Sequence, residues 1–199
     1  MNPYLYFCLI YMSVGMMNSC RMQIPEVTDQ VRKSVSNGDT LQLFYIPSAA
    51  RPNKTKDHLV YHGYRFGEIN QTRGAVSGVA LDGEYEFFYR KALIRKGSFQ
   101  NGLKTGDWYH WDENGNLMSI EPYRNGELNG IVKQFDAEGT VTGFQRYRNN
   151  QKDGIGMYEE GDGRIFFKYK QGVATDTLQS LSNAQQLRYN VKGVVNDTN

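Results

Sequence analysis

Cysteine is scarce in this chain. There are two in 199 residues, Cys8 and Cys20, and both lie in the first twenty positions. A domain that begins after residue 20 therefore cannot be held together by disulfides, even in an oxidising compartment. Its stability must come from packed side chains and from backbone hydrogen bonds.

Long runs of one charge are also absent. The 23 basic and 21 acidic residues leave a net charge of +2, and no five like charges follow one another. This balance argues against a nucleic-acid footprint and against a polybasic membrane patch. Pairs of aromatic and basic residues such as Tyr89-Arg90 are accounted for by cross-strand contacts in a sheet.

Reactive constellations are missing as well. The chain has no P-loop and no Gly-x-Ser-x-Gly motif. His58 and His62 stand four apart in a segment that reads as a strand, where four residues span ~13 Å, too far for two ligands of one ion. The segment 112–116 lacks the glycine and the bidentate glutamate of a calcium loop, which favours a hairpin turn. The sequence therefore predicts no enzyme, no cofactor and no metal site.

Glycine, in contrast, recurs at a regular interval. Gly83, Gly106, Gly130 and Gly154 are separated by 23, 24 and 24 residues, and each opens a block with a shared pattern of aromatic and turn residues. A fixed period is typical of an architecture built by stacking small units. The predicted blocks are 83–105, 106–129, 130–153 and 154–176. The residues that define the repeat are Gly83, Gly106, Trp108, Trp111, Gly115, Tyr123, Gly126, Gly130, Phe135, Gly139, Tyr147 and Gly154.

Each block divides into two short runs rich in aromatic and β-branched residues. Turn formers separate the runs, as at Asn114-Gly115, and follow the second run, as at Asn101-Gly102 and Asn125-Gly126. Asn and Gly adopt the positive φ of tight hairpin turns at little cost. No 3.6-residue apolar period crosses 60–175, which argues against helices there. The sequence predicts an all-β fold, an elongated antiparallel meander of repeated β-hairpins with about ten to twelve short strands.

The aromatic positions leave one choice open. Trp108, Trp111, Tyr123, Phe135 and Tyr147 are predicted to stack in ladders between neighbouring hairpins. However, the apolar positions two and five residues after each opening glycine have opposite parity in a strand. Either both faces of the sheet carry aromatics, or a bulge near the glycine brings them to one face.

These residues lead to a family resemblance. The segment Gly-Asp-Trp-Tyr-His-Trp-Asp-Glu-Asn-Gly-Asn-Leu at 106–117, followed by Tyr123-Arg124-Asn125-Gly126, resembles the bacterial variant of the membrane occupation and recognition nexus (MORN) repeat. It looks like the repeats of YwqK-family antitoxins, over about 83–175. The third and fourth blocks depart from the pattern, with Gly156 and Glu159 at aromatic positions and Asn150 at a glycine position. The resemblance implies stacked hairpins, and its motif contains no reactive group.

The first nineteen residues read as a signal peptide. They carry no charged side chain, and the apolar run across 3–17 is shorter than the ~20 residues of a membrane span. The run ends at Asn18-Ser19-Cys20, which resembles a bacterial lipobox whose cysteine is acylated. A cleaved signal with an incidental Cys20 and an uncleaved anchor are the alternatives. Two acyl chains suffice for stable membrane attachment, whereas one is marginal.

The remaining segments complete the predicted layout. Residues 20–40 are polar and are predicted to be the lipidated N-terminus and a tether, and 41–82 a strand-rich lead-in. Residues 177–199 are predicted to be a short C-terminal helix that covers the sheet edge, or a disordered tail. Arg21 follows the cysteine without an acidic cluster, which favours an outer-membrane lipoprotein that faces the periplasm.

The sequence predicts a non-catalytic, envelope-tethered lipoprotein that acts as a protein-binding scaffold in an envelope or secretion assembly. The alternative, implied by the resemblance, is an antitoxin or immunity protein. Partner contact is predicted to centre on 106–148, because these blocks carry both tryptophans. The candidate contact residues are Tyr109, His110, Arg124 and Arg146, which occupy positions that the repeat does not fix. Ordinary solvated or edge-protecting residues are the alternative for these four.

Overall fold

The computed structural model describes residues 29–49, 54–160 and 163–178. These residues form fifteen β-strands and no helix. The strands are β1 (Gln30–Asn37), β2 (Thr40–Pro47), β3 (Val60–Arg65), β4 (Glu68–Arg73), β5 (Val79–Ala80), β6 (Gly83–Tyr89), β7 (Ala92–Gln100), β8 (Leu103–Trp111), β9 (Leu117–Arg124), β10 (Glu127–Leu128), β11 (Gly130–Phe135), β12 (Val141–Arg148), β13 (Gln151–Glu160), β14 (Gly163–Lys170) and β15 (Val173–Leu178).

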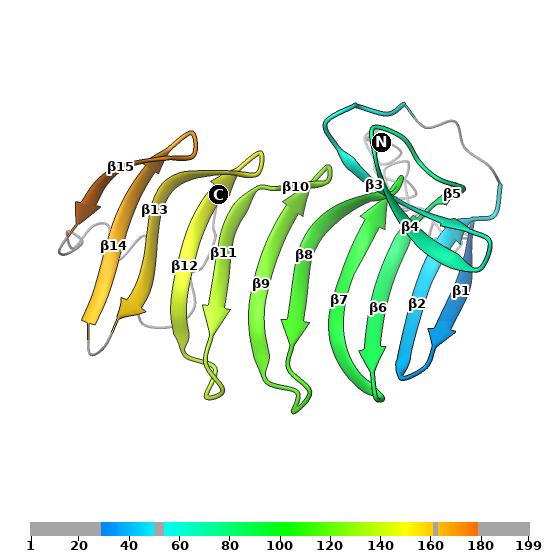
Figure 1. Ribbon diagram of the computed structural model, residues 1–199, viewed down its shortest axis with the longest axis horizontal. Helices are drawn as coiled ribbons and strands as arrows, with labels where there is room; N and C mark the ends of the chain where they lie inside the picture. Colours follow the sequence, from blue (N-terminus) through cyan, green and yellow to red (C-terminus); the bar gives the residue numbers. More distant parts are fainter. Residues whose placement is uncertain (1–28, 50–53, 161–162, 179–199) are drawn as a thin grey trace, which may run out of the picture.

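Twelve of these strands build one long antiparallel sheet (Figure 1). Its order is β1-β2-β6-β7-β8-β9-β11-β12-β13-β14-β15, with the short β10 paired to β9. From β6 onward each strand pairs with the next along the chain, apart from the step past β10. The predicted all-β meander of hairpins is confirmed.

Tight turns form at the predicted Asn101-Gly102 and Asn125-Gly126 dipeptides and also at Gln171-Gly172. Asn101, Asn125 and Gln171 have φ of 51°, 52° and 50°. Each turn also rests on the preceding hairpin, since for example the Gly126 N–H donates to the Lys104 carbonyl at 2.9 Å. The turn chemistry therefore fixes both the hairpins and their stacking.

The loop at 112–116 is a hairpin turn closed by its own aspartate. The Asp112 carboxylate accepts hydrogen bonds from the backbone N–H groups of Asn114 and Asn116, at 2.9 and 2.8 Å. These bonds, chiefly those from Asn116, lower the pKa of the Asp112 carboxyl. Asp136 closes the next loop in the same way through Thr140.

A second, three-stranded sheet of order β4-β3-β5 packs against one end of the long sheet (Figure 1). We call the side of the long sheet that it covers the lead-in face, and the other side the opposite face. The main core lies between the two sheets. It comprises the buried residues Phe44, Ile46, Leu81, Tyr85, Phe99 and Trp108, with Tyr64, Ile69 and Val79 of the small sheet packed against them.

Aromatic residues occupy both faces of the long sheet, which settles the choice left open by the sequence. Trp108 lies in the core on the lead-in face, whereas Trp111 stacks on Tyr109 on the opposite face at 5.8 Å. The ladder on the lead-in face links Trp108 to Tyr85, Phe99 and Tyr123 at centroid distances of 5.6, 5.0 and 6.2 Å.

The predicted ladder is shorter than expected. Among the described residues no ring contact involves Phe135 or Tyr147. The reason is that the third block has Val132 where the second has Trp108, so no large ring links the neighbouring hairpins there. A separate cluster, on the opposite face of the C-terminal half, consists of Ile131, Phe144, Ile155, Met157 and Phe166.

One predicted boundary needs correction. Residues 30–37 of the predicted tether form β1, which pairs along its whole length with β2. The sequence gives little sign of this strand because it lies at the sheet edge and all its residues except Gln30 and Val35 are exposed, so no alternating apolar pattern marks it. The lead-in at 41–82 contributes β2 to the long sheet and β3–β5 to the small sheet. The long sheet has twelve strands, within the predicted ten to twelve, and the small sheet adds three that the sequence did not predict.

Most of the predictions for the two ends lie outside the described residues. The signal peptide at 1–19 and acylation of Cys20 do so entirely. Of the predicted helix or tail at 177–199, only Thr177 and Leu178 are described, and they are the last two residues of strand β15 rather than the start of a helix. Among the residues that are described, no helix is long and apolar enough to span a membrane.

Candidate functional site

The four predicted contact residues do not form one surface. Tyr109 and Arg146 project from the opposite face. The Arg146 side chain packs against the backbone of Gly154 there. Arg124 is exposed at the end of β9. His110 lies on the lead-in face. A shared contact surface made by these four residues is therefore not present, and the role of each stays a prediction.

His110 belongs to a small charged cluster beside the core. Its Nε2 lies 3.4 Å from Glu121 Oε2, and the Tyr123 hydroxyl donates to the same oxygen at 3.1 Å. The Lys104 ammonium lies 4.2 Å from the Trp108 ring centroid and 4.6 Å from that of Tyr123. Lys104 thus makes cation–π contacts with both rings, and the neighbouring Glu121 carboxylate already contacts His110 and Tyr123.

The pKa shifts in this cluster follow from burial and pairing. The pKa of the Glu121 carboxyl is lowered, chiefly by its contact with His110. Burial lowers the pKa of Lys104 and raises that of Tyr123. Each group contacts a partner inside the cluster, which favours a packing role. In the described part of the chain, no three His, Cys, Asp or Glu residues gather as a metal site would require.

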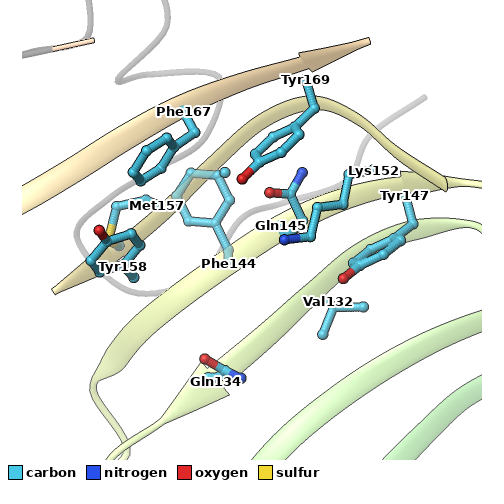
Figure 2. A pocket seen from close by; sticks show the side chains of 11 residues that line it. Val132, Gln134, Phe144, Gln145, Tyr147, Lys152, Met157, Tyr158, Phe167 and Tyr169 are labelled. Atoms are coloured by element: carbon cyan, nitrogen blue, oxygen red, sulfur yellow. The ribbon is translucent and has the colours of Figure 1, made fainter. Parts of the chain in front are cut away.

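The C-terminal half of the lead-in face holds a shallow groove of about 270 Å³. The small sheet covers this face only at the other end of the molecule. Figure 2 shows the amide of Gln145 between the rings of Tyr147 and Tyr169, with Lys152 beside them. The side chains that line the groove from this face are Val132, Gln134, Gln145, Tyr147, Lys152, Tyr158, Phe167 and Tyr169.

The aromatic side chains along the groove contact one another. Phe167 stacks on Tyr158 at 5.2 Å, with an interplanar angle of 14°, and lies 6.3 Å from Tyr169. The Lys152 ammonium lies 4.9 Å from the Tyr169 ring centroid. Lys152 holds the repeat position of Lys104, two residues before the opening glycine. The same cation–π arrangement thus recurs, although here it borders the groove.

The groove exists because a pair of neighbouring residues on adjacent strands differs between the repeats. In the second block, the Trp108 indole lies on Gly97 of the neighbouring strand. In the fourth block the position of Trp108 is Gly156, and the Gln145 side chain from the neighbouring strand lies on that glycine instead. A flexible amide replaces an indole, and the surface above it stays open.

This arrangement suits binding. Rigid aromatic rings with a few polar groups are typical of ligand and protein contact surfaces. The sequence prediction missed Gln145, Lys152, Tyr158 and Phe167, because it favoured the blocks closest to the repeat pattern. The groove is instead marked by departures from the repeat pattern, because Val132 and Gly156 stand where the second block has an aromatic residue.

Comparison with known families bears on the second block. Residues 104–125, from β8 through β9 to the following turn, match the family described as MORN repeat variant. The match supports a MORN-repeat protein. MORN repeats are generally protein- or membrane-binding modules and are not enzymatic. No curated protein matches the chain.

Proposed function

We propose that this protein is a non-catalytic, protein-binding scaffold that is tethered to the bacterial cell envelope. The observation that carries the binding role is the groove of Tyr147, Tyr158, Phe167 and Tyr169 on a sheet face that the chain's own lead-in covers elsewhere. The same face of the same repeat array thus packs on protein at one end, and its other end offers a comparable aromatic surface to a partner.

The tether is supported by the sequence alone. An uncharged apolar run ends at Ser19-Cys20, and the chain turns polar directly after it. Acylation of Cys20 would fix the N-terminus in a membrane, and Arg21 favours the outer membrane on its periplasmic side. The relation to YwqK-family proteins belongs to this proposal as well, and it rests on the repeat motif at 106–126.

Affinity purification of the tagged lipoprotein from detergent-solubilised envelopes tests the binding role. The decisive variant combines Gln145→Gly with Gly156→Trp, which rebuilds the pair formed by Gly97 and Trp108 and fills the groove. We expect this variant to fold and to lose the partner that the wild type captures. Equal capture by both proteins would contradict binding in the groove.

The anchor is tested by Cys20→Ala. We expect the variant to lose metabolic palmitate labelling and to leave the membrane fraction. Unchanged membrane association would point to an uncleaved anchor. If the captured partner is toxic and the gene is required only in its presence, the protein is an antitoxin or immunity protein instead.

A further inference from the structure

The tip of the β3–β4 hairpin carries an aromatic residue in an unusual setting. Phe66 is 89% exposed, the most exposed large hydrophobic side chain in the described part of the chain. It occupies the turn between Arg65 and Glu68 with φ of 55°. A bulky residue with positive φ is an outlier, and this backbone conformation is strained.

Comparable turns of the same molecule use polar residues. Among the described non-glycine residues, the others with positive φ are Arg90, Lys91, Asn101, Asn125, Asn149, Asn150 and Gln171. Asn tolerates this conformation, and its side chain is compatible with water. Phe66 is unfavourable on both counts, in backbone conformation and in exposure. A contact outside the folded domain would offset the cost.

The Arg65 side chain makes this tip amphipathic. Its guanidinium carbon lies 4.5 Å from the centroid of the Phe66 ring. An aromatic ring with a cation on one side suits the boundary between lipid headgroups and acyl chains, where the ring enters the apolar layer and the guanidinium meets phosphate.

The length of the N-terminal segment brings this end of the molecule to the membrane. Ten peptide steps separate Cys20 from Gln30, the first residue of β1. Fully extended, they span at most ~35 Å. β1 pairs with β2, and Phe44 of β2 contacts Tyr64 of β3 at 5.2 Å. An anchor at Cys20 therefore holds the small sheet close to the bilayer surface.

We infer that Phe66 and Arg65 form a second membrane contact, in which the Phe66 ring inserts into the lipid interface and orients the sheet on the membrane. This inference rests on the proposed tether at Cys20. The hairpin tip would take phospholipid as its ligand, and the groove at the other end of the long sheet would stay free for a protein.

The test uses the acylated full chain reconstituted into vesicles of phosphatidylethanolamine and phosphatidylglycerol with brominated acyl chains. Phe66→Trp places an indole at the tip, and Val173→Trp is the matched control because Val173 is a 66% exposed turn-proximal residue of β15, at the far edge of the sheet. After subtraction of the wild-type emission, we expect bromine quenching and a blue shift for Phe66→Trp and neither for Val173→Trp. Equal, water-like emission from both indoles would overturn the inference.

A second variant guards against an effect of the tryptophan itself. Phe66→Cys with a nitroxide label introduces the only unacylated cysteine of the mature chain, and its accessibility to oxygen should exceed that to a water-soluble nickel complex. Preference for the nickel complex, or protection only when a captured protein is bound, would contradict lipid contact. Failure of the tether would appear separately, as protein that does not incorporate into the vesicles.

Phe66→Asn separates function from folding. We expect this variant to unfold at a higher temperature than the wild type, because it removes the strained, exposed ring. A lower unfolding temperature would show that Phe66 serves the fold and would remove the basis of the inference.

Discussion

The indole of Trp108 lies flat on Gly97, across the β7–β8 pairing. A Cβ at Gly97 would overlap the ring at three of its atoms. The register of β7 and β8 shifts between Lys96 and Ser98, so Gly97 sits in an irregularity that opens space for the ring. As a result Trp108, at 2% exposure, links the core of the lead-in to the repeats.

Gly97→Ala should therefore destabilise the protein. The added methyl group must displace a packed indole, and overpacking of this kind costs roughly 1–3 kcal/mol. Chemical denaturation measures the loss. Gly143→Ala is the matched control. That glycine also lies in a strand, but a Cβ there would lie 3.0 Å from the end of the flexible Gln134 side chain and 3.3 Å from the Met157 carbonyl oxygen, whereas a Cβ at Gly97 would lie still closer to the indole. Equal costs for the two variants would contradict a specific role of the Trp108 contact.

His62 should make stability depend on pH in a defined window. Its ring packs on Phe99 at 4.6 Å, and burial lowers its pKa from 6.5 to about 4. Between these values the unfolded state binds more protons than the folded state, so stability falls as the pH is lowered from 6.5 towards 4. The loss attributable to His62 is at most about 3 kcal/mol.

The difference between wild type and His62→Phe isolates this effect from the titration of other groups. We expect the free energy of unfolding of the wild type, relative to the variant, to decrease as the pH falls from 7 to about 4. A difference that does not change with pH would show that the His62 ring is protonated equally in both states.

The groove and the predicted contact residues can be tested separately, because neither Tyr109 nor Arg124 lines the groove. Tyr109→Ala with Arg124→Ala removes predicted contacts outside the groove and should shift the thermal midpoint by no more than a few degrees. Since the groove lies on the lead-in face, we expect this double variant to retain the partner that the groove-filling variant loses. Loss of capture in the double variant would instead support the sequence-based choice of Tyr109 and Arg124.

The repeated hairpins could be predicted from the sequence, whereas the features that depart from the repeat could not. Dipeptides such as Asn101-Gly102 specify a turn by local backbone preference, so the hairpins followed directly from their spacing. The partner of β1 and the existence of the small sheet depend on contacts distant in sequence, such as Phe44 with Tyr64. No local pattern encodes these contacts. The groove depends on the exchange of Gln145 and Gly156, which becomes meaningful only when the neighbouring strand is known.

The opening glycines of the repeat should differ in how strongly they resist substitution. Gly130 has φ of 140°, and a Cβ there would lie 2.7 Å from Pro122 Cγ. Gly106 holds the same repeat position with φ of 65° and open space around it. An alanine tolerates the second conformation at a cost of about 1 kcal/mol, whereas the first is accessible essentially to glycine alone.

Gly130→Ala should therefore cost clearly more than Gly106→Ala, by about 1–3 kcal/mol in the free energy of unfolding. The loss should concentrate where β9 meets β11, because a Cβ at Gly130 of β11 would meet Pro122 of β9, which itself has no N–H to donate. Hydrogen exchange of the Lys133 and Gln134 amides, whose residues pair with Ile120 and Ser119, reports on this seam. Faster exchange there in Gly130→Ala, and not in Gly106→Ala, is the expected pattern. Equal exchange and equal stability in the two variants would show that the glycine spacing reflects turn preference alone and that Pro122 places no demand on Gly130.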